Sequence, residues 1–289
     1  MGGDSVGAFL SKECYNLGRQ VNGGAWMNWG SIDRYAKSLI KEAGHKIRVS
    51  FFSTIDIDSK ADANDLVTNI DRDIERFFIS RIKRDFPEHR IFGEEGFGDE
   101  IESLDGVIWM LDPIDGTMNF IHQKRNFAIS LGIYLDGIGM LGYIYDVMND
   151  DFYHAAKDEG AYYNDERLAV LENTPLEEAI IGVNASWVAP NRRIEHMPIA
   201  EMVHKCRGTR SYGSAAMELA YVASGRIDAY LSLRLSPWDI AGGMIIAREV
   251  GAIATNMKGE APHLLGQDTF IVAKPGLHDE ILKNHILLK

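Results

Sequence analysis

Two long apolar segments, residues 127–135 and 138–147, are separated only by Asp136-Gly137, and this pair constrains the fold more than any other feature. An Asp-Gly dipeptide between two apolar runs is a strong signal for a two-residue hairpin turn. The two segments are therefore predicted to be adjacent antiparallel strands of one sheet.

Helical patterns precede and follow this hairpin. Helices are predicted at about residues 32–40, from Asp71 to the stop at Pro87, at 214–224 and at 237–250. The last is the best marked, because Ser236, Pro237 and Asp239 fit an N-cap, a first-turn proline and a capping-box acid. Further strands are predicted at 90–92, 107–111, 180–183 and 229–233. Helices and strands mixed in this order indicate a layered α/β architecture.

Composition and patterning exclude several classes of protein. No apolar run approaches the roughly 20 residues that span a bilayer, and residues 1–26 lack the pattern of a signal peptide. The two cysteines, Cys14 and Cys206, cannot form a disulfide framework and suit a reducing compartment. We therefore expect a cytoplasmic protein without a membrane partner, in which residues 1–26 are a poorly structured extension and residues 27–289 form a single domain.

The formal net charge of −12 argues against nucleic acid as a partner, because binding a phosphate backbone requires a basic face. Two explanations of the acidic total remain open. The excess carboxylates either keep the protein soluble or gather around bound cations, and only their positions decide between the two.

One group of carboxylates follows a predicted buried strand. Asp112 and Asp115 come directly after the apolar residues 107–111, with the Ile114 carbonyl between them as a further oxygen ligand. Two carboxylates this close repel each other unless a cation lies between them, and hard oxygen ligands favour magnesium. Gly116 and Thr117 then begin a helical turn, whose amides suit phosphate. The alternative is that Asp-Pro and Asp-Gly are only turn formers.

Other acidic residues accompany this group. Glu94 and Glu95 follow a short apolar strand, Asp65 and Asp71 bracket a short segment before the second helix, and Asp239 lies in the first turn of the last predicted helix. An acidic surface loop is the usual explanation of an isolated Glu-Glu pair, and helix capping is expected of Asp71 and Asp239 in any case. Capping also holds the Asp239 carboxylate where it can bind a metal.

In this order, these residues resemble the inositol monophosphatase family, within the lithium-sensitive, magnesium-dependent phosphatases. Four blocks carry the resemblance: residues 65–71, 93–95, 109–119 and 236–243. It implies a five-layer α-β-α-β-α fold, a homodimer, and two to three magnesium ions in the active site. It also implies the metal ligands, which are Glu94, Asp112, the Ile114 carbonyl, Asp115 and Asp239.

The resemblance further implies how a water molecule attacks the phosphate. Thr117, hydrogen-bonded to Asp65, orients and deprotonates the water, and Glu95 adds a contact to metal-bound water. The amides of Gly116 and Thr117 hold phosphate oxygens. Phosphoryl transfer needs mainly positioning and electrostatics, so that no serine or cysteine nucleophile is required.

The substrate is less constrained than the reaction. Gly213, Ser214 and Ala215 match the family segment that faces the substrate alcohol, although a plain helix cap explains them equally well. Ser232 stands where inositol-preferring members carry a glutamate, and Arg234 is available to contact a second phosphate or another acidic group.

Inositol-1-phosphate is therefore the first candidate substrate, with fructose-1,6-bisphosphate, NADP and 3′-phosphoadenosine nucleotides still open. Lys60 is the nearest basic residue before the residue 65–71 block, and its role is open. A non-catalytic regulatory protein on the same fold is the alternative from a different class. Such a protein is expected to lose metal ligands, since buried carboxylates are costly without a cation.

Overall fold

The structure is a computed structural model that describes residues 27–59 and 66–289. The chain divides into two compact units, Met1–Glu42 and Ala43–Lys289. The described part of the first unit carries most of helix α1 (Trp29–Ser50), where Lys37 and Asp33 form an ion pair of 3.0 Å one turn apart. The predicted extension, residues 1–26, lies outside the described residues, and the single domain from residue 27 to 289 stays a prediction.

The second unit contains a seven-stranded sheet in which neighbouring strands are also neighbours in sequence. Its strands, in spatial order, are β3 (Arg90–Gly93), β4 (Val107–Asp115), β5 (Ala128–Leu135), β6 (Ile138–Asp146), β7 (Asp151–Ala156), β8 (Gly160–Tyr163) and β9 (Glu166–Arg167). The predicted hairpin is confirmed: β5 pairs with β6 antiparallel, and both Asp136 and Gly137 have positive φ, as a two-residue turn of this type requires. Strand β4 is buried along its whole length, which explains the continuous apolar run of residues 107–111.

A five-stranded sheet follows, in the order β11 (Gly208–Arg210), β10 (Ile180–Val183), β12 (Ala229–Leu235), β14 (Asp268–Ala273) and β13 (Ile253–Thr255). Strands β11, β10 and β12 are parallel, whereas β14 runs antiparallel to both of its neighbours. The carboxyl ends of the three parallel strands therefore lie at one edge of this sheet.

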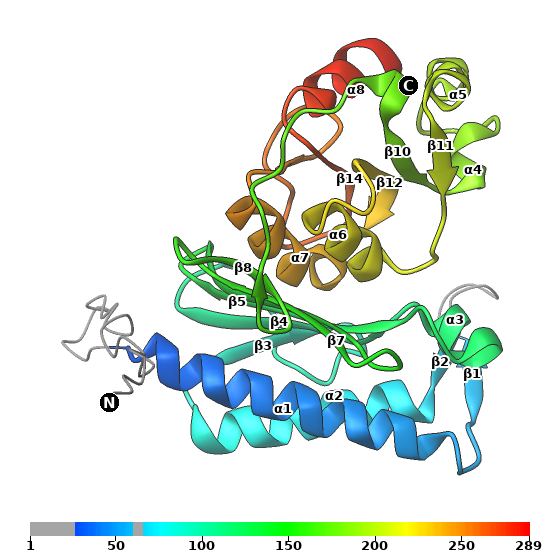
Figure 1. The fold of residues 1–289 in the computed structure, drawn as a ribbon. Helices are drawn as coiled ribbons and strands as arrows, with labels where there is room; N and C mark the ends of the chain where they lie inside the picture. The colour runs from blue at the N-terminus through cyan, green and yellow to red at the C-terminus, as the bar shows by residue number, and fades with distance from the viewer. Residues whose placement is uncertain (1–26, 60–65) are drawn as a thin grey trace, which may run out of the picture. The chain divides into compact units, whose positions relative to one another are not determined.

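Helices separate and cover the sheets of the second unit, so that five layers alternate as the family resemblance implies (Figure 1). Helix α2 (Asn69–Asp85) packs against the seven-stranded sheet, α6 (Ala215–Ala223) and α7 (Pro237–Glu249) lie between the sheets, and α5 (His196–Lys205) and α8 (Leu277–His285) form the outer layer. The approach of α7 to the sheet is close. A Cβ atom on Gly242 would lie 2.6 Å from the Tyr143 carbonyl oxygen and 2.7 Å from that of Leu131.

Several elements differ from the sequence expectation. Strand β4 does not end at residue 111 but continues to Asp115, with an irregularity in its pairing to β5 between Asp112 and Asp115. Strand β1 (Ile57–Ser59) pairs antiparallel with β2 (Leu66–Thr68), and neither strand was predicted. Helix α8 follows the helix that was expected to be last, and helix α4 (Ala185–Val188) was not predicted either. Within residues 27–59 and 66–289, no helix combines the length and the apolar character needed to span a membrane.

Candidate metal centre

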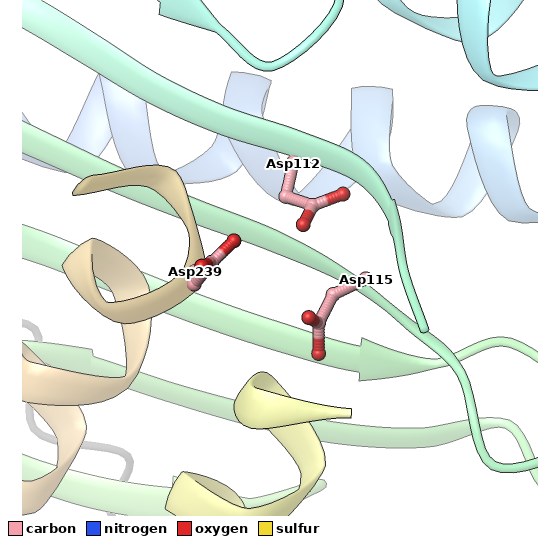
Figure 2. A group of neighbouring side chains, drawn as sticks. All are labelled: Asp112, Asp115 and Asp239. Atoms are coloured by element: carbon pink, nitrogen blue, oxygen red, sulfur yellow. The ribbon is translucent and has the colours of Figure 1, made fainter. Parts of the chain in front are cut away.

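Three aspartates converge at the end of strand β4. The carboxylates of Asp112, Asp115 and Asp239 each offer an oxygen atom, and these atoms all lie within 4.8 Å of one another (Figure 2). In a regular strand, residues three apart point to opposite faces. The irregularity between Asp112 and Asp115 breaks this alternation, and both side chains therefore reach the same cluster.

Helix α7 brings the third aspartate to this cluster. Ser236 is its N-cap and Pro237 its first residue, and the Ser236 backbone N–H donates to Asp239 Oδ2 at 2.7 Å in a capping box. The predicted start of this helix is thereby confirmed. Because the cap uses one oxygen of the carboxylate, the other oxygen remains directed toward the strand that carries Asp112 and Asp115 (Figure 2).

Helix α6 orients Asp115 in a similar way. The Ser214 hydroxyl and the Ala216 backbone N–H, the latter at 2.7 Å, both donate to Asp115 Oδ2. Ser214 is also the N-cap of α6 and accepts a hydrogen bond from the Met217 backbone N–H at 3.2 Å. The helix-cap explanation of Ser214 is therefore correct, and the same residue also fixes a carboxylate of the cluster.

Burial and mutual repulsion dominate the electrostatics of the cluster. Asp112 is 1% exposed, and its pKa lies well above the ordinary value because of burial and the neighbouring carboxylates of Glu94, Asp115 and Asp239. Burial also raises the pKa of Asp115 to about 6, although the Ser214 hydroxyl and the Ala216 amide favour its charged form. Such a cluster is unfavourable for the protein alone and favourable around a cation.

The donor set fits a hard divalent cation, since it consists of carboxylate and carbonyl oxygens. Glu94 is half-buried at the end of β3, and its carboxyl group is close enough to hydrogen-bond with Asp112. The Ile114 carbonyl oxygen lies 3.2 Å from Thr117 Oγ1. Four of the predicted ligands therefore interact within one acidic cluster, and the fifth, Ile114, lies between two of them in sequence.

Thr117 begins helix α3 (Thr117–Gln123), and its hydroxyl group contacts a carboxylate of helix α2. Its Oγ1 lies 3.2 Å from Asp71 Oδ1. The predicted partner, Asp65, lies outside the described residues, as does Lys60. Asp71 also forms the expected capping box with Thr68, and burial raises its pKa.

Sequence reasoning assigned only this cap to Asp71. No local pattern indicated that Thr117, 46 residues away, would contact the same carboxylate.

The other predicted site residues come from several different parts of the chain. Gly116, the N-cap of α3, has a φ of +96°. Gly213, which precedes the α6 N-cap Ser214, has a φ of +75°. Ser232 is buried on β12, whereas the Arg234 side chain is exposed at the end of the same strand. Glu95 is half-buried, and its backbone N–H donates to Glu75.

Comparisons with known proteins agree with this arrangement. Residues 28–286 match the model of the inositol monophosphatase family. The inositol-1-monophosphatase of Bacillus subtilis (strain 168) is 52% identical over 259 residues, which are 90% of this chain and 98% of that protein.

Solved structures of a staphylococcal inositol monophosphatase II are similar over most of both chains. The complex with inositol monophosphate has a TM-score of 0.80 and 39% identity, and covers 89% of this chain and 93% of that one. The complex with 2′-AMP has a TM-score of 0.82 and 41% identity, and covers 89% of this chain and 94% of that one.

Proposed function

This chain belongs to the inositol monophosphatase family, and on that premise we propose that it is a magnesium-dependent phosphomonoesterase acting on small phosphorylated alcohols. One observation carries the proposal: three buried or half-buried aspartates from β4 and α7 present oxygen atoms within 4.8 Å of one another. Buried carboxylates this close are costly without a cation, so a regulatory protein that binds no metal is expected to lose them. The catalytic domain is proposed to extend from residue 27 to 289.

The cation ligands are proposed to be the Glu94, Asp112, Asp115 and Asp239 carboxylates and the Ile114 carbonyl, for two to three magnesium ions. Bound magnesium supplies neutralisation of the phosphate charge and a lower pKa for water in the site. The chain itself sets the geometry of the ligands. The Ser236 cap fixes Asp239, and the Ser214 hydroxyl fixes Asp115.

A water molecule is proposed to lose its proton through Thr117 and Asp71. The Thr117 hydroxyl donates to Asp71 Oδ1, so its oxygen lone pairs remain available to accept a hydrogen bond from water. Because burial raises the pKa of Asp71, this carboxylate is a stronger base than an exposed aspartate. Asp65 remains a second candidate for this role, Glu95 a candidate contact to the water, and the Gly116 and Thr117 amides candidate phosphate contacts.

Inositol monophosphate is the first candidate substrate, supported by the identity to the B. subtilis enzyme and by the similarity to the inositol monophosphate complex. A nucleotide with a 2′-phosphate is the second, because a similar structure contains 2′-AMP and because a serine occupies position 232. The exposed guanidinium of Arg234 is available to a further phosphate where the nucleotide carries one, as NADP does.

The test is phosphate release from a panel of inositol-1-phosphate, fructose-1,6-bisphosphate, NADP, 2′-AMP and 3′-phosphoadenosine nucleotides, with and without magnesium. We expect magnesium-dependent release from at least one of them, with inositol-1-phosphate among the best. An Arg234→Ala variant should lose activity on the substrates with a second phosphate more than on inositol-1-phosphate. Equal release with and without magnesium would overturn the proposal.

Assembly and location are further parts of the proposal, and family membership supports them. The protein is proposed to be a cytoplasmic homodimer. Light scattering coupled to size-exclusion chromatography should give about twice the chain mass of 32.3 kDa. A monomer across the working concentration range would contradict this part and leave the proposed reaction unaffected.

A further inference from the structure

Glu75 is a buried acidic residue that belongs to no predicted site. It lies on helix α2 with 0% of its surface exposed. Its Oε2 accepts the Glu95 backbone N–H at 2.7 Å, and its Oε1 accepts the Phe97 backbone N–H at 2.9 Å. A buried carboxylate whose two oxygens each accept a hydrogen bond from a backbone amide holds the loop that carries those amides in one conformation.

The sequence of the loop makes room for this carboxylate. Gly93 lies at the end of β3, and a Cβ atom at this position would come within 2.5 Å of Glu75 Cδ and 2.6 Å of Oε2. Any larger residue would therefore displace the carboxylate from the loop amides. Glycine at position 93 and glutamate at position 75 are complementary in shape.

The loop held by Glu75 carries two of the acidic residues of the candidate site. Glu94 and Glu95 lie between Gly93 and the second held amide, and the Glu94 carboxyl interacts with Asp112. Backbone pairing fixes the start of the loop, since the Glu94 N–H donates to the Leu111 carbonyl at 3.3 Å.

Asp99 closes the end of the loop. The Asp99 carboxylate accepts the Ile91 N–H at 2.8 Å and pairs with Lys83 of α2 at 2.8 Å. Between these two ends, the two hydrogen bonds to Glu75 hold the middle of the loop.

Helix α2 also places the partner of Thr117. Asp71 and Glu75 are four residues apart and therefore lie on the same face, one turn from each other. Asp71 contacts the Thr117 hydroxyl, and Glu75 contacts the loop of Glu94. One turn of helix thus fixes both the proposed proton acceptor and a proposed cation ligand.

We infer that Glu75 is a positioning residue that holds Glu94 and Glu95 in the geometry required to bind a divalent cation. This inference deepens the proposed function and rests on it. Glu75 contacts the loop backbone and is not itself a proposed cation ligand. Groups that hydrogen-bond to metal-binding elements typically change metal affinity by about 10- to 100-fold when removed.

The test uses Glu75→Gln in the full-length protein, with the exposed Glu88→Gln as the matched control. Glutamine keeps the shape but replaces one acceptor by an NH2 group, which then faces a backbone N–H. Calorimetry should show magnesium and calcium affinities about tenfold or more weaker than in the parent, with the control unchanged. In steady-state assays, the magnesium concentration at half-maximal rate should rise by a similar factor, while kcat at saturating magnesium falls much less.

A second pair of variants separates loop positioning from simple packing. Gly93→Ala alone should lower both the melting temperature and the cation affinity, because its Cβ atom meets Glu75. Gly93→Ala combined with Glu75→Ala removes this collision and should recover part of the melting temperature, but the cation affinity should stay low because the two loop amides lack their acceptor.

Cation affinity equal to the parent in Glu75→Gln, or full recovery of affinity in the double variant, would overturn the inference. Because calorimetry measures binding without turnover, an inactive parent protein that binds magnesium would refute only the proposed function.

Discussion

Asp112→Asn is expected to make the metal-free protein more stable while it abolishes magnesium-dependent phosphate release. The Asp112 carboxylate is buried among the carboxylates of Glu94, Asp115 and Asp239. Asparagine has nearly the same shape, and its side-chain oxygen can still accept the Ile114 backbone N–H, which lies 3.0 Å from Asp112 Oδ1. The substitution therefore removes a charge and little else.

The magnitude follows from the separation of the carboxylates. Two ionised groups 4.8 Å apart repel by about 3.5 kcal/mol at an effective dielectric constant of 20. Burial and its neighbours raise the pKa of Asp112, and proton uptake already relieves part of this repulsion near neutral pH. We expect the variant to gain on the order of 2 kcal/mol in free energy of unfolding, below the value for a fully ionised pair.

Urea denaturation of the chelator-treated protein at neutral pH measures this gain. The same titration in excess magnesium measures how much stabilisation by magnesium the variant has lost. Magnesium at 100 times its dissociation constant should stabilise the parent by about 2.7 kcal/mol and the variant far less. Asp73→Asn is a suitable control, because this side chain is 66% exposed on α2. A metal-free variant less stable than the parent, or one that magnesium stabilises equally, would refute the electrostatic reasoning.

Three further outcomes are expected. Thr117→Val removes the hydroxyl that contacts Asp71 and should lower kcat by about 10²- to 10⁴-fold, while magnesium binding measured by calorimetry is retained. A kcat near that of the parent would contradict the role of Thr117. Burial lowers the pKa of His89 to about 4, so its neutral form stabilises the folded state above pH 6.5, and this stability is lost as the pH falls toward 4. Between pH 7 and pH 5 the loss should be about 2 kcal/mol in urea titrations and absent in His89→Gln. Gly242→Ala should destabilise the protein by about 1–3 kcal/mol and weaken magnesium binding. The added Cβ atom pushes α7, whose first turn carries Asp239, away from the backbone carbonyls of β5 and β6. Wild-type magnesium affinity by calorimetry would show that the helix can shift without moving the carboxylate.

The sequence by itself determined the local elements and the identity of the acidic residues. The hairpin at Asp136-Gly137 and the capping box of Ser236 and Asp239 were predictable because each depends on residues within a few positions of one another. The motif of Asp112 and Asp115 indicated a cation for the same reason, since two neighbouring carboxylates after a buried strand repel each other wherever the strand lies.

Only the tertiary structure decided which distant groups complete the site. No local pattern distinguishes Glu75 from the other acidic residues of α2, and its function follows from the missing side chain of Gly93 and from two amides 20 and 22 residues away. The sequence likewise indicates only a helix cap for Asp71, and the contact of Thr117 with its second carboxylate oxygen follows from the fold. Hydrogen bonds of this kind depend on how β3, β4 and α2 pack against one another, and packing is a property of the whole core that no short segment encodes.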